Sequence, residues 1–318
     1  GPRRHIQSVK PHTAQKAAIF CISSLTLCKS RKRRVRAKIA KKPLAEEYGL
    51  CRITKNILKF GKIYRTIKTL EQKDTAVKAV HTEKFKVEWA DTCASGHLSL
   101  PGMLNFIQVT AGNHANELGI GYYHMAAAGQ AWVLNRLKAR FTRMPRWTEE
   151  IEASTWIESF NDVISERNIL ITHKGQTIAQ VSTVWVCINY EKRAPEAIAV
   201  PYPPEVVLPE KKLDIKTASR VRMPSDARPL RTYRVSFSDI DAMGHVNNIK
   251  YTQWIVDSLP YEAAVGITSG EIEANFLSEL HYGDTVDIES AKSGDGFTFA
   301  VRRQGCEKPA FISHFNPL

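Results

Sequence analysis

The chain has 318 residues, of which 43% are hydrophobic, so we expect a globular protein with room for two domains rather than a disordered one. Its net charge of +13 is typical of proteins that bind nucleic acids or membrane surfaces. However, residues 1–45 hold 13 Lys and Arg and no acidic residue, which leaves 32 basic against 32 acidic residues in the rest. A basic tail without interleaved aromatic residues, joined to a balanced body, argues against nucleic-acid binding.

The N-terminal segment is treated separately from the fold. Its longest apolar stretch, residues 17–28, is shorter than the roughly 20 residues that a membrane-spanning helix needs, so no stable membrane insertion is expected. A strongly basic stretch follows it instead of a small-residue cleavage site, and the whole segment also fits an organelle transit peptide. We take residues 1–80 as a disordered, targeting or non-native extension. The expected location is cytoplasmic, or plastid if the extension is a transit peptide.

An internal repeat organises the remaining chain. Residues 87–98 (VEWADTCASGHL) and residues 235–246 (VSFSDIDAMGHV) share their pattern at a constant offset of 148 residues. Each begins with alternating apolar and polar residues, which predicts a half-buried strand, and ends in a Gly-His turn. A repeat of this length predicts two copies of one structural unit.

A helix is expected after each turn. In the first copy Ser99 is a plausible N-cap, Pro101 suits the first turn, and an apolar stripe follows at helical spacing. In the second copy Asn247 or Asn248 can cap the helix that carries Tyr251, Trp254, Ile255 and Leu259. Four strands should follow each helix: residues 132–142, 150–159, 163–173 and 177–190, then 271–279, 284–291, 297–302 and 310–314.

This element order predicts an α+β fold in which each helix covers an antiparallel sheet, with the two sheets able to pair edge to edge. The predicted boundaries are 83–205 for the first copy, 206–228 for a linker rich in Pro, Lys and Arg, and 229–318 for the second copy. One chain with two copies of the unit already resembles a dimer of single units. The protein could therefore be a monomer or a homodimer.

The motifs resemble those of a known enzyme family. A strand followed by Asp-x-x-Gly-His-Val-Asn-Asn and a helix resembles the hot-dog thioesterase signature, and residues 132–137, 145–147 and 182–186 narrow the likeness. Residues 83–318 resemble the acyl-acyl carrier protein (acyl-ACP) thioesterases of plants and bacteria. That resemblance implies a tandem double hot-dog fold, hydrolysis of fatty acyl-ACP in fatty acid biosynthesis, acyl carrier protein as partner, and one active site in the second copy.

The family's catalytic segment matches this chain at Asp241, His245, Asn247 and Asn248, while Met243 replaces the family's Asn. Further along, Glu279 matches an acidic residue, and Leu280 stands where the family has Cys, which argues against a Cys–His mechanism. We therefore expect Asp241, His245 and Glu279 to be catalytic, and Asn247, Asn248 and Trp132 to contact substrate. Asp241 would attack the thioester carbonyl or activate water with Glu279, and His245 would orient the carbonyl or donate a proton. Backbone N–H groups at residues 245–248 could form an oxyanion hole.

The two copies differ at the carboxylates. Cys93 and Met144 occupy the first-copy positions of Asp241 and Glu279, so the first copy is expected to be non-catalytic and to shape the acyl pocket with residues 104–118 and the strand from Trp132. Asp239 has a counterpart in the first copy, Asp91, and is expected to be structural.

No cofactor and no metal are expected, because no cysteine pair has a histidine partner at zinc spacing and the P-loop, GxSxG and HExxH patterns do not occur. Eight basic residues in and after the linker could dock an acidic carrier protein or could simply be solvated: Lys211, Lys212, Lys216, Arg220, Arg222, Arg228, Arg231 and Arg234.

Three alternative functions stay open. Asp-Ala-Met-Gly-His-Val-Asn-Asn also resembles single hot-dog acyl-CoA thioesterases, so the carrier could be coenzyme A. The fold could also serve a non-catalytic acyl-binding or regulatory protein, or a dehydratase. Two carboxylates present in only one copy favour catalysis over binding alone.

Overall fold

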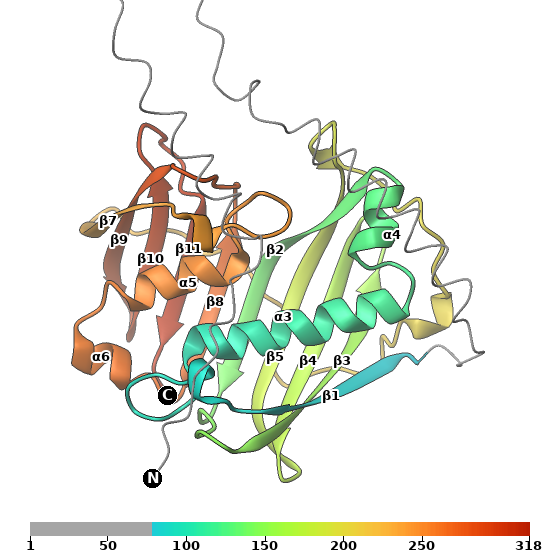
Figure 1. Ribbon diagram of the computed structural model, residues 1–318, viewed down its shortest axis with the longest axis horizontal. Helices are drawn as coiled ribbons and strands as arrows, with labels where there is room; N and C mark the ends of the chain where they lie inside the picture. The colour runs from blue at the N-terminus through green and yellow to red at the C-terminus, as the bar shows by residue number, and fades with distance from the viewer. Residues whose placement is uncertain (1–77) are drawn as a thin grey trace, which may run out of the picture. The chain divides into compact units, whose positions relative to one another are not determined.

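The computed structural model describes residues 78–318, and the expectations for residues 1–77 lie outside that range. The described residues form one antiparallel sheet with the main strand order β1-β3-β4-β5-β2-β8-β11-β10-β9-β7. Two helices lie across the same face of this sheet (Figure 1). This is the α+β double hot-dog architecture expected from the sequence.

The first copy forms one half of the sheet. Its strands are β1 (Val80–Lys86), β2 (Gln130–Phe141), β3 (Glu150–Phe160), β4 (Ile164–His173) and β5 (Gln176–Asn189), with the short β6 (Ala194–Pro195) beside β5. Its helices are η3 (Trp89–Asp91), α3 (Leu100–Glu117) and α4 (Tyr122–Ala127), and η4 (Pro204–Val206) follows the strands.

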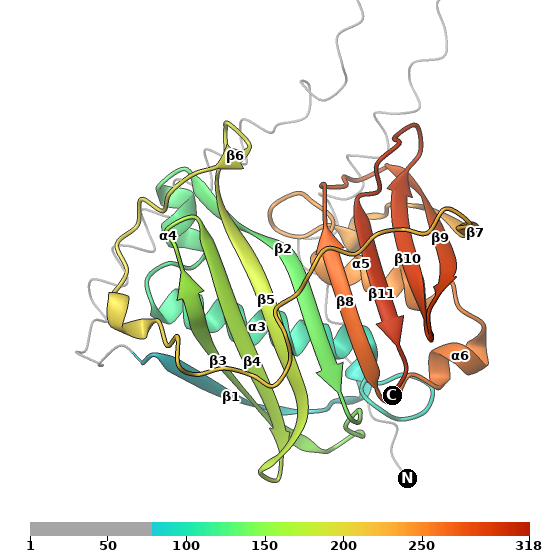
Figure 2. The ribbon, with the colours of Figure 1, turned by 180° about the vertical axis from the view of Figure 1, so that it is seen from behind.

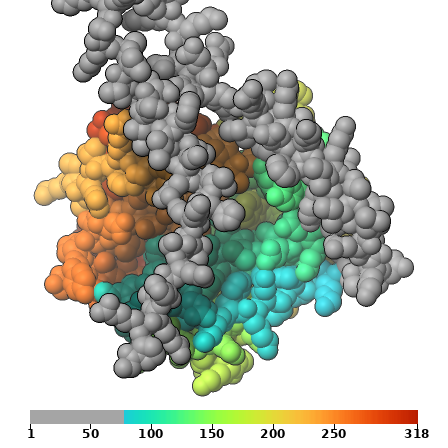
Figure 3. Space-filling model, viewed as in Figure 1, coloured from blue at the N-terminus to red at the C-terminus, as the bar shows by residue number. Residues whose placement is uncertain are grey.

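The second copy repeats the order with shorter elements. Its strands are β7 (Arg228–Arg234), β8 (Gly270–Phe276), β9 (Thr285–Ser293), β10 (Gly296–Arg303) and β11 (Phe311–Asn316). Its helices are η5 (Phe237–Asp239), α5 (Asn248–Val256) and α6 (Tyr261–Val265). The space-filling view shows the cyan-to-green first copy beside the orange second copy (Figure 3).

The copies join through β2 and β8, which pair antiparallel with Arg136 opposite Asn275 and Phe141 opposite Gly270. The edge-to-edge pairing expected from the sequence is therefore confirmed. In this pairing the backbone N–H and C=O groups of the two central strands satisfy each other. The strand order then ends at β1 on one side and at β7 on the other.

The expected helix starts are also found. The Ser99 hydroxyl accepts a hydrogen bond from the Gly102 N–H, Pro101 lies in the first turn, and the Asn247 side chain accepts from the Ile249 N–H. These caps satisfy N–H groups that a helix leaves unpaired at its start. Helix α3 then buries its apolar face on the first half of the sheet, and Tyr251, Trp254 and Ile255 of α5 enter the core of the second.

The segment between the copies is packed rather than free. It crosses the face of the sheet opposite the helices (Figure 2). The Trp156 Nε1–H donates to the Lys211 carbonyl at 2.7 Å, and the Asn275 side chain both accepts from the Val221 N–H at 2.7 Å and donates to the Ser219 carbonyl at 2.8 Å. These contacts tie the segment to both halves of the sheet.

Candidate functional site

The turn that carries Asp241 is anchored by Asp239. This carboxylate is 3% exposed and accepts hydrogen bonds from the Tyr233 hydroxyl at 2.8 Å and the Ser236 N–H at 2.8 Å. Asp91 closes the equivalent turn of the first copy on the Glu88 N–H at 3.0 Å. The expectation that Asp239 is structural is confirmed, and its role is to position the residues that follow.

Asp241 lies half-buried at the start of this turn. Its Oδ1 accepts a hydrogen bond from the Met243 N–H at 2.8 Å, and the His245 N–H also donates to its carboxylate. Burial raises the pKa of this carboxyl above its usual value, against the lowering effect of the two N–H donors. Gly244 allows the turn to close because it adopts a φ of 79°, which favours glycine.

His245 follows the turn and faces Glu279. Its Nε2 lies 3.3 Å from a Glu279 carboxylate oxygen, and its ring packs edge-on against His281 with centroids 5.1 Å apart. Burial, then His281 and Arg193, lowers the pKa of His245 to about 4. The imidazole is therefore neutral near pH 7, where one ring nitrogen donates and the other accepts.

Glu279 reaches the site from a loop. The sequence placed it at the end of a strand over residues 271–279, which is wrong at its end, because β8 stops at Phe276. The backbone leaves the sheet where the Leu277 and Ser278 N–H groups both turn to the Ala310 carbonyl. The Glu279 carboxylate contacts the guanidinium of Arg193 as well as His245. Arg193 was not among the residues expected at the site, because nothing in the local pattern of a residue in the first copy relates it to a site in the second.

Fewer backbone N–H groups are available for the expected oxyanion hole than the sequence predicted. The Val246 N–H donates to the Leu280 carbonyl and the Asn247 N–H to the Asp239 carbonyl, both at 2.9 Å. The His245 N–H is taken by Asp241. Of the N–H groups of residues 245–248, the one given no partner by the described residues is that of Asn248, the first residue of α5. The helix start thus offers one backbone donor beside the cavity, where the helix dipole favours negative charge.

The three residues expected to contact substrate have different surroundings. The Asn247 side-chain oxygen is engaged as the helix cap. Asn248 lines the cavity beside Asp241. Trp132 lines the same cavity while its Nε1–H donates to the Ile120 carbonyl at 3.0 Å. Asn248 and Trp132 therefore lie at the cavity, whereas the Asn247 side chain caps helix α5.

A cavity of about 540 Å³ lies between the copies. Asp241, His245 and Glu279 line it from the second copy, and Trp132 and Arg193 from the first. The sequence motifs alone could not place a first-copy arginine in it.

Three side chains of this region could also hold a metal ion. One ligand atom each from His245, Glu279 and His281 lies within 4.8 Å of the others. The Arg193 guanidinium already contacts the Glu279 carboxylate, and a second cation there would be repelled. The arrangement therefore suits a hydrogen-bonded network better than a metal centre.

The first copy lacks this chemistry at the equivalent turn. Ser95, at the position of Met243, lies 3.1 Å from both the Cys93 sulfur and the His97 Nδ1. Met144, at the position of Glu279, is 1% exposed and belongs to the core. Helix α3 and β2 instead line a second cavity under the helix. That this cavity holds an acyl chain stays a prediction.

Stability should fall in mild acid because two histidines are neutral in the folded protein. The pKa values of His245 and His114 are both lowered from 6.5 to about 4, mainly by burial. Their contribution is complete above pH 6.5 and is lost as the pH falls toward 4, by at most about 3 kcal/mol each, since only the unfolded chain then binds the protons.

Thermal melts from pH 8 to pH 4.5 measure this effect. The variant His245→Asn should lose less Tm over that interval than the wild type. An equal or larger loss would show that His245 does not contribute.

Comparison with known proteins supports the family resemblance. The profile described as the acyl-ACP thioesterase N-terminal domain matches residues 78–205, and that of the C-terminal domain matches residues 223–316. The palmitoyl-acyl carrier protein thioesterase of Arabidopsis thaliana, named chloroplastic, is 30% identical over 57% of this chain and 47% of its own length. The chloroplastic oleoyl-acyl carrier protein thioesterase of Coriandrum sativum is 24% identical over 70% of this chain and 65% of its own length.

Solved structures agree with the fold. An acyl-ACP thioesterase from Bacteroides thetaiotaomicron aligns with a TM-score of 0.68 and 26% identity over 75% of this chain and 97% of its own. The 12:0-ACP thioesterase of Umbellularia californica has a TM-score of 0.61 at 18% identity over 75% and 96%, a likeness of fold alone. In the described part of the chain, no helix is long and apolar enough to cross a membrane.

The chain spans less than half the length of the first two curated relatives that it matches, 43% and 47%. The two family domains nevertheless cover the two copies in order, and the sheet joins them as one double hot-dog. The chain therefore belongs to the acyl-ACP thioesterase family.

Proposed function

We propose that this protein hydrolyses the thioester of fatty acyl-ACP and releases free fatty acid and acyl carrier protein. The observation that carries the proposal is the cavity in which Asp241, His245 and Glu279 meet, since both carboxylates occur only in the second copy. Family membership and the names of the relatives support the same activity. The direct test is release of free fatty acid from purified acyl-ACP, compared with the Asp241→Asn variant.

Each polar group has a proposed task in this reaction. Asp241, a half-buried carboxylate with a raised pKa, is the nucleophile or the base that activates water. Neutral His245 donates a hydrogen bond or a proton to the developing oxyanion or to the leaving thiolate. Glu279, which contacts His245 and Arg193, orients the imidazole and positions water. The Asn248 N–H is the backbone donor available for the carbonyl oxygen.

Coenzyme A remains the second candidate carrier, because Met243 stands where the family has Asn and lines the cavity. Acyl-ACP and acyl-CoA with the same acyl chain should be compared by kcat/KM. A clear preference for acyl-ACP is expected. Hydrolysis of acyl-CoA alone would favour the coenzyme A reading, and hydrolysis of neither would favour a non-catalytic acyl-binding protein.

The basic residues of the linker and β7 are proposed to dock the carrier. All eight are exposed, and none of them lines the cavity around Asp241. Reversing the charge of Lys212, Lys216, Arg220 and Arg222 together should raise KM for acyl-ACP severalfold, since acidic carrier proteins of this pathway would then be repelled. KM for a small acyl thioester should stay unchanged. Equal effects on both substrates would contradict docking at this surface.

The location of the protein in the cell is proposed from its relatives and from the composition of its N-terminal segment. The chloroplastic relatives and the acid-free, basic residues 1–45 support a plastid location over a cytoplasmic one. A monomer is proposed over a homodimer, because the two copies already pair within one chain.

A further inference from the structure

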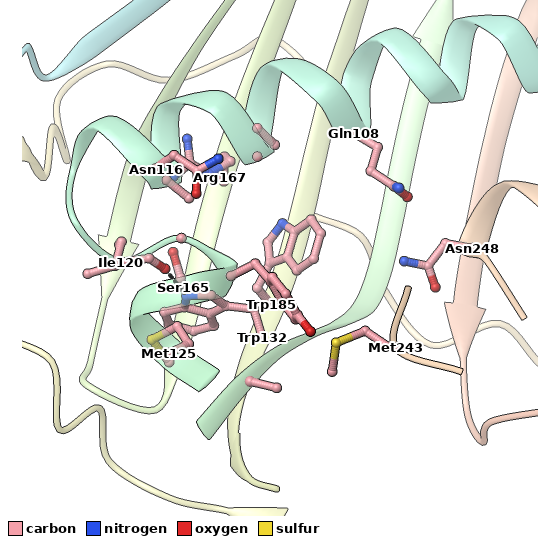
Figure 4. Close-up of a pocket in the computed structure, with 16 residues that line it drawn as sticks. Gln108, Asn116, Ile120, Met125, Trp132, Ser165, Arg167, Trp185, Met243 and Asn248 are labelled. Carbon is pink, nitrogen blue, oxygen red and sulfur yellow. Dashed lines mark hydrogen bonds between the residues drawn. The ribbon is translucent and has the colours of Figure 1, made fainter. Parts of the chain in front are cut away.

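A second cavity of about 290 Å³ extends from the site beneath helix α3. It shares Ala131, Trp132, Met243 and Asn248 with the cavity around Asp241. Figure 4 shows Met243 and Asn248 at one end, the indoles of Trp132 and Trp185 in the middle, and Arg167 at the opposite end. An acyl chain whose thioester lies at Asp241 would therefore point its far end toward Arg167.

Arg167 is a buried cation that has no carboxylate partner among the described residues. It lies on β4 and is 5% exposed. Its Nη1 donates to the His114 Nδ1 at 2.7 Å and to the Thr155 hydroxyl at 3.2 Å. His114 donates its other ring N–H to the Lys78 carbonyl at 3.0 Å, so it accepts at Nδ1 and is neutral. Within residues 78–318 no carboxylate forms an ion pair with Arg167.

The remaining donors of this guanidinium define the chemistry of the far end. Both hydrogen bonds leave from Nη1, and the described residues provide no partner for Nε or Nη2. Arg167 itself lines the cavity, as does Ser165, two residues earlier on the same strand. Nε–H and Nη2–H groups that have no partner among residues 78–318 present the planar pair of donors that a carboxylate accepts in two parallel hydrogen bonds.

A methyl group would be a poor occupant of this end. It would exclude water from the Nε–H and Nη2–H groups without replacing its hydrogen bonds, and leaving buried charged donors unpaired is costly. An oxygen acceptor would satisfy them, and an anionic one would also supply the missing counter-charge.

We propose that Arg167 forms a polar subsite that selects acyl chains carrying a carboxylate on their terminal carbon over methyl-terminated chains of the same length. This inference rests on the proposed thioesterase function, because it assigns the substrate class of that same site. The hydrolysed substrates would be monothioesters of long-chain dicarboxylic acids.

The test compares pairs of acyl thioesters of equal carbon number, one methyl-terminated and one ω-carboxylated, over a series of lengths. At the length that reaches Arg167, the ω-carboxylated substrate should show a kcat/KM at least about tenfold higher, as expected for a charge-assisted hydrogen bond. Arg167→Met should remove or reverse this preference, and Arg167→Lys should keep part of it. Arg140→Met makes the same change at an exposed arginine of β2 and should leave the preference unchanged.

Two results separate this inference from the function beneath it. If the wild type hydrolyses methyl-terminated thioesters equally well or better at every length, the subsite is wrong and the thioesterase stands. If it hydrolyses neither substrate, the proposed function fails. The binding of free acids then tests the Arg167 subsite. Free dicarboxylic acids should then raise the wild-type Tm more than monocarboxylic acids of the same length, and equal shifts would overturn the proposal. Neither comparison depends on the Arg167 variants folding.

Discussion

Replacing Asp241 with Asn is expected to lower kcat for acyl-thioester hydrolysis by roughly 10²- to 10⁴-fold with little change in KM. The amide keeps the shape of the side chain and an oxygen that can accept from the Met243 N–H, so the turn should persist. It cannot act as a base or nucleophile. Steady-state kinetics on acyl-ACP measure the loss, and a circular dichroism melt verifies folding.

The repeat supplies a matched control for this substitution. Cys93 occupies the same turn position in the first copy, so Cys93→Ala should leave kcat within about twofold of the wild type. An Asp241→Asn enzyme that keeps near-wild-type kcat would remove Asp241 from the chemistry.

The same residue allows the two mechanisms to be separated. In direct attack, Asp241 forms a mixed anhydride with the acyl group and the thiol leaves. If labelled water then opens this anhydride at the Asp241 carbonyl during a single turnover in ¹⁸O-labelled water, the first fatty acid carries an unlabelled Asp241 oxygen and the label enters the Asp241 side chain. Attack by activated water places the label in the fatty acid at once. Mass spectrometry of the product and of the peptide that contains Asp241 reads these outcomes. Label in the Asp241 side chain identifies direct attack, whereas label in the fatty acid alone excludes a mixed anhydride opened at the Asp241 carbonyl.

His245 and Glu279 are expected to act as a unit across the 3.3 Å contact between them. His245→Asn and Glu279→Gln should each lower kcat by roughly 10²-fold or more, and the double variant should lose little beyond the larger single loss. The physical reason is that a misoriented imidazole and an absent one both leave the oxyanion or leaving group without its donor.

A double-mutant cycle on kcat measures this coupling. Strictly additive losses would show that Glu279 works independently of His245. The pH profile adds a second readout, because the acidic limb of kcat should change when His245 is removed.

The local sequence was a good guide to elements and caps. The alternation before each Gly-His turn, the Ser99 and Asn247 caps and the starts of most strands depend on interactions within a few residues, and the structure places them close to where the pattern indicated. The difference between the copies was also visible, because Cys93 and Asp241 align through the repeat without knowledge of the fold.

The sequence did not predict which hydrogen-bond partners the backbone N–H groups of the site take. The amides of Val246 and Asn247 looked available at a helix start, but the Leu280 and Asp239 carbonyls take them. Glu279 was assigned to a strand, although the chain leaves the sheet after Phe276. Both errors arise because hydrogen-bond partners across a turn or a sheet edge are chosen by tertiary packing, which residue periodicity does not encode.

For this protein, then, the amino-acid sequence determined the two copies, their α+β elements and the carboxylates that mark the second copy. Only the tertiary structure decided that β2 and β8 join the copies in one sheet, which brings Arg193 of the first copy to Glu279 of the second. It also placed the buried Arg167 at the end of the cavity that leads away from Asp241. The reason is distance along the chain: helical, strand and capping preferences act over a few residues, whereas a site between two copies depends on which surfaces pack together.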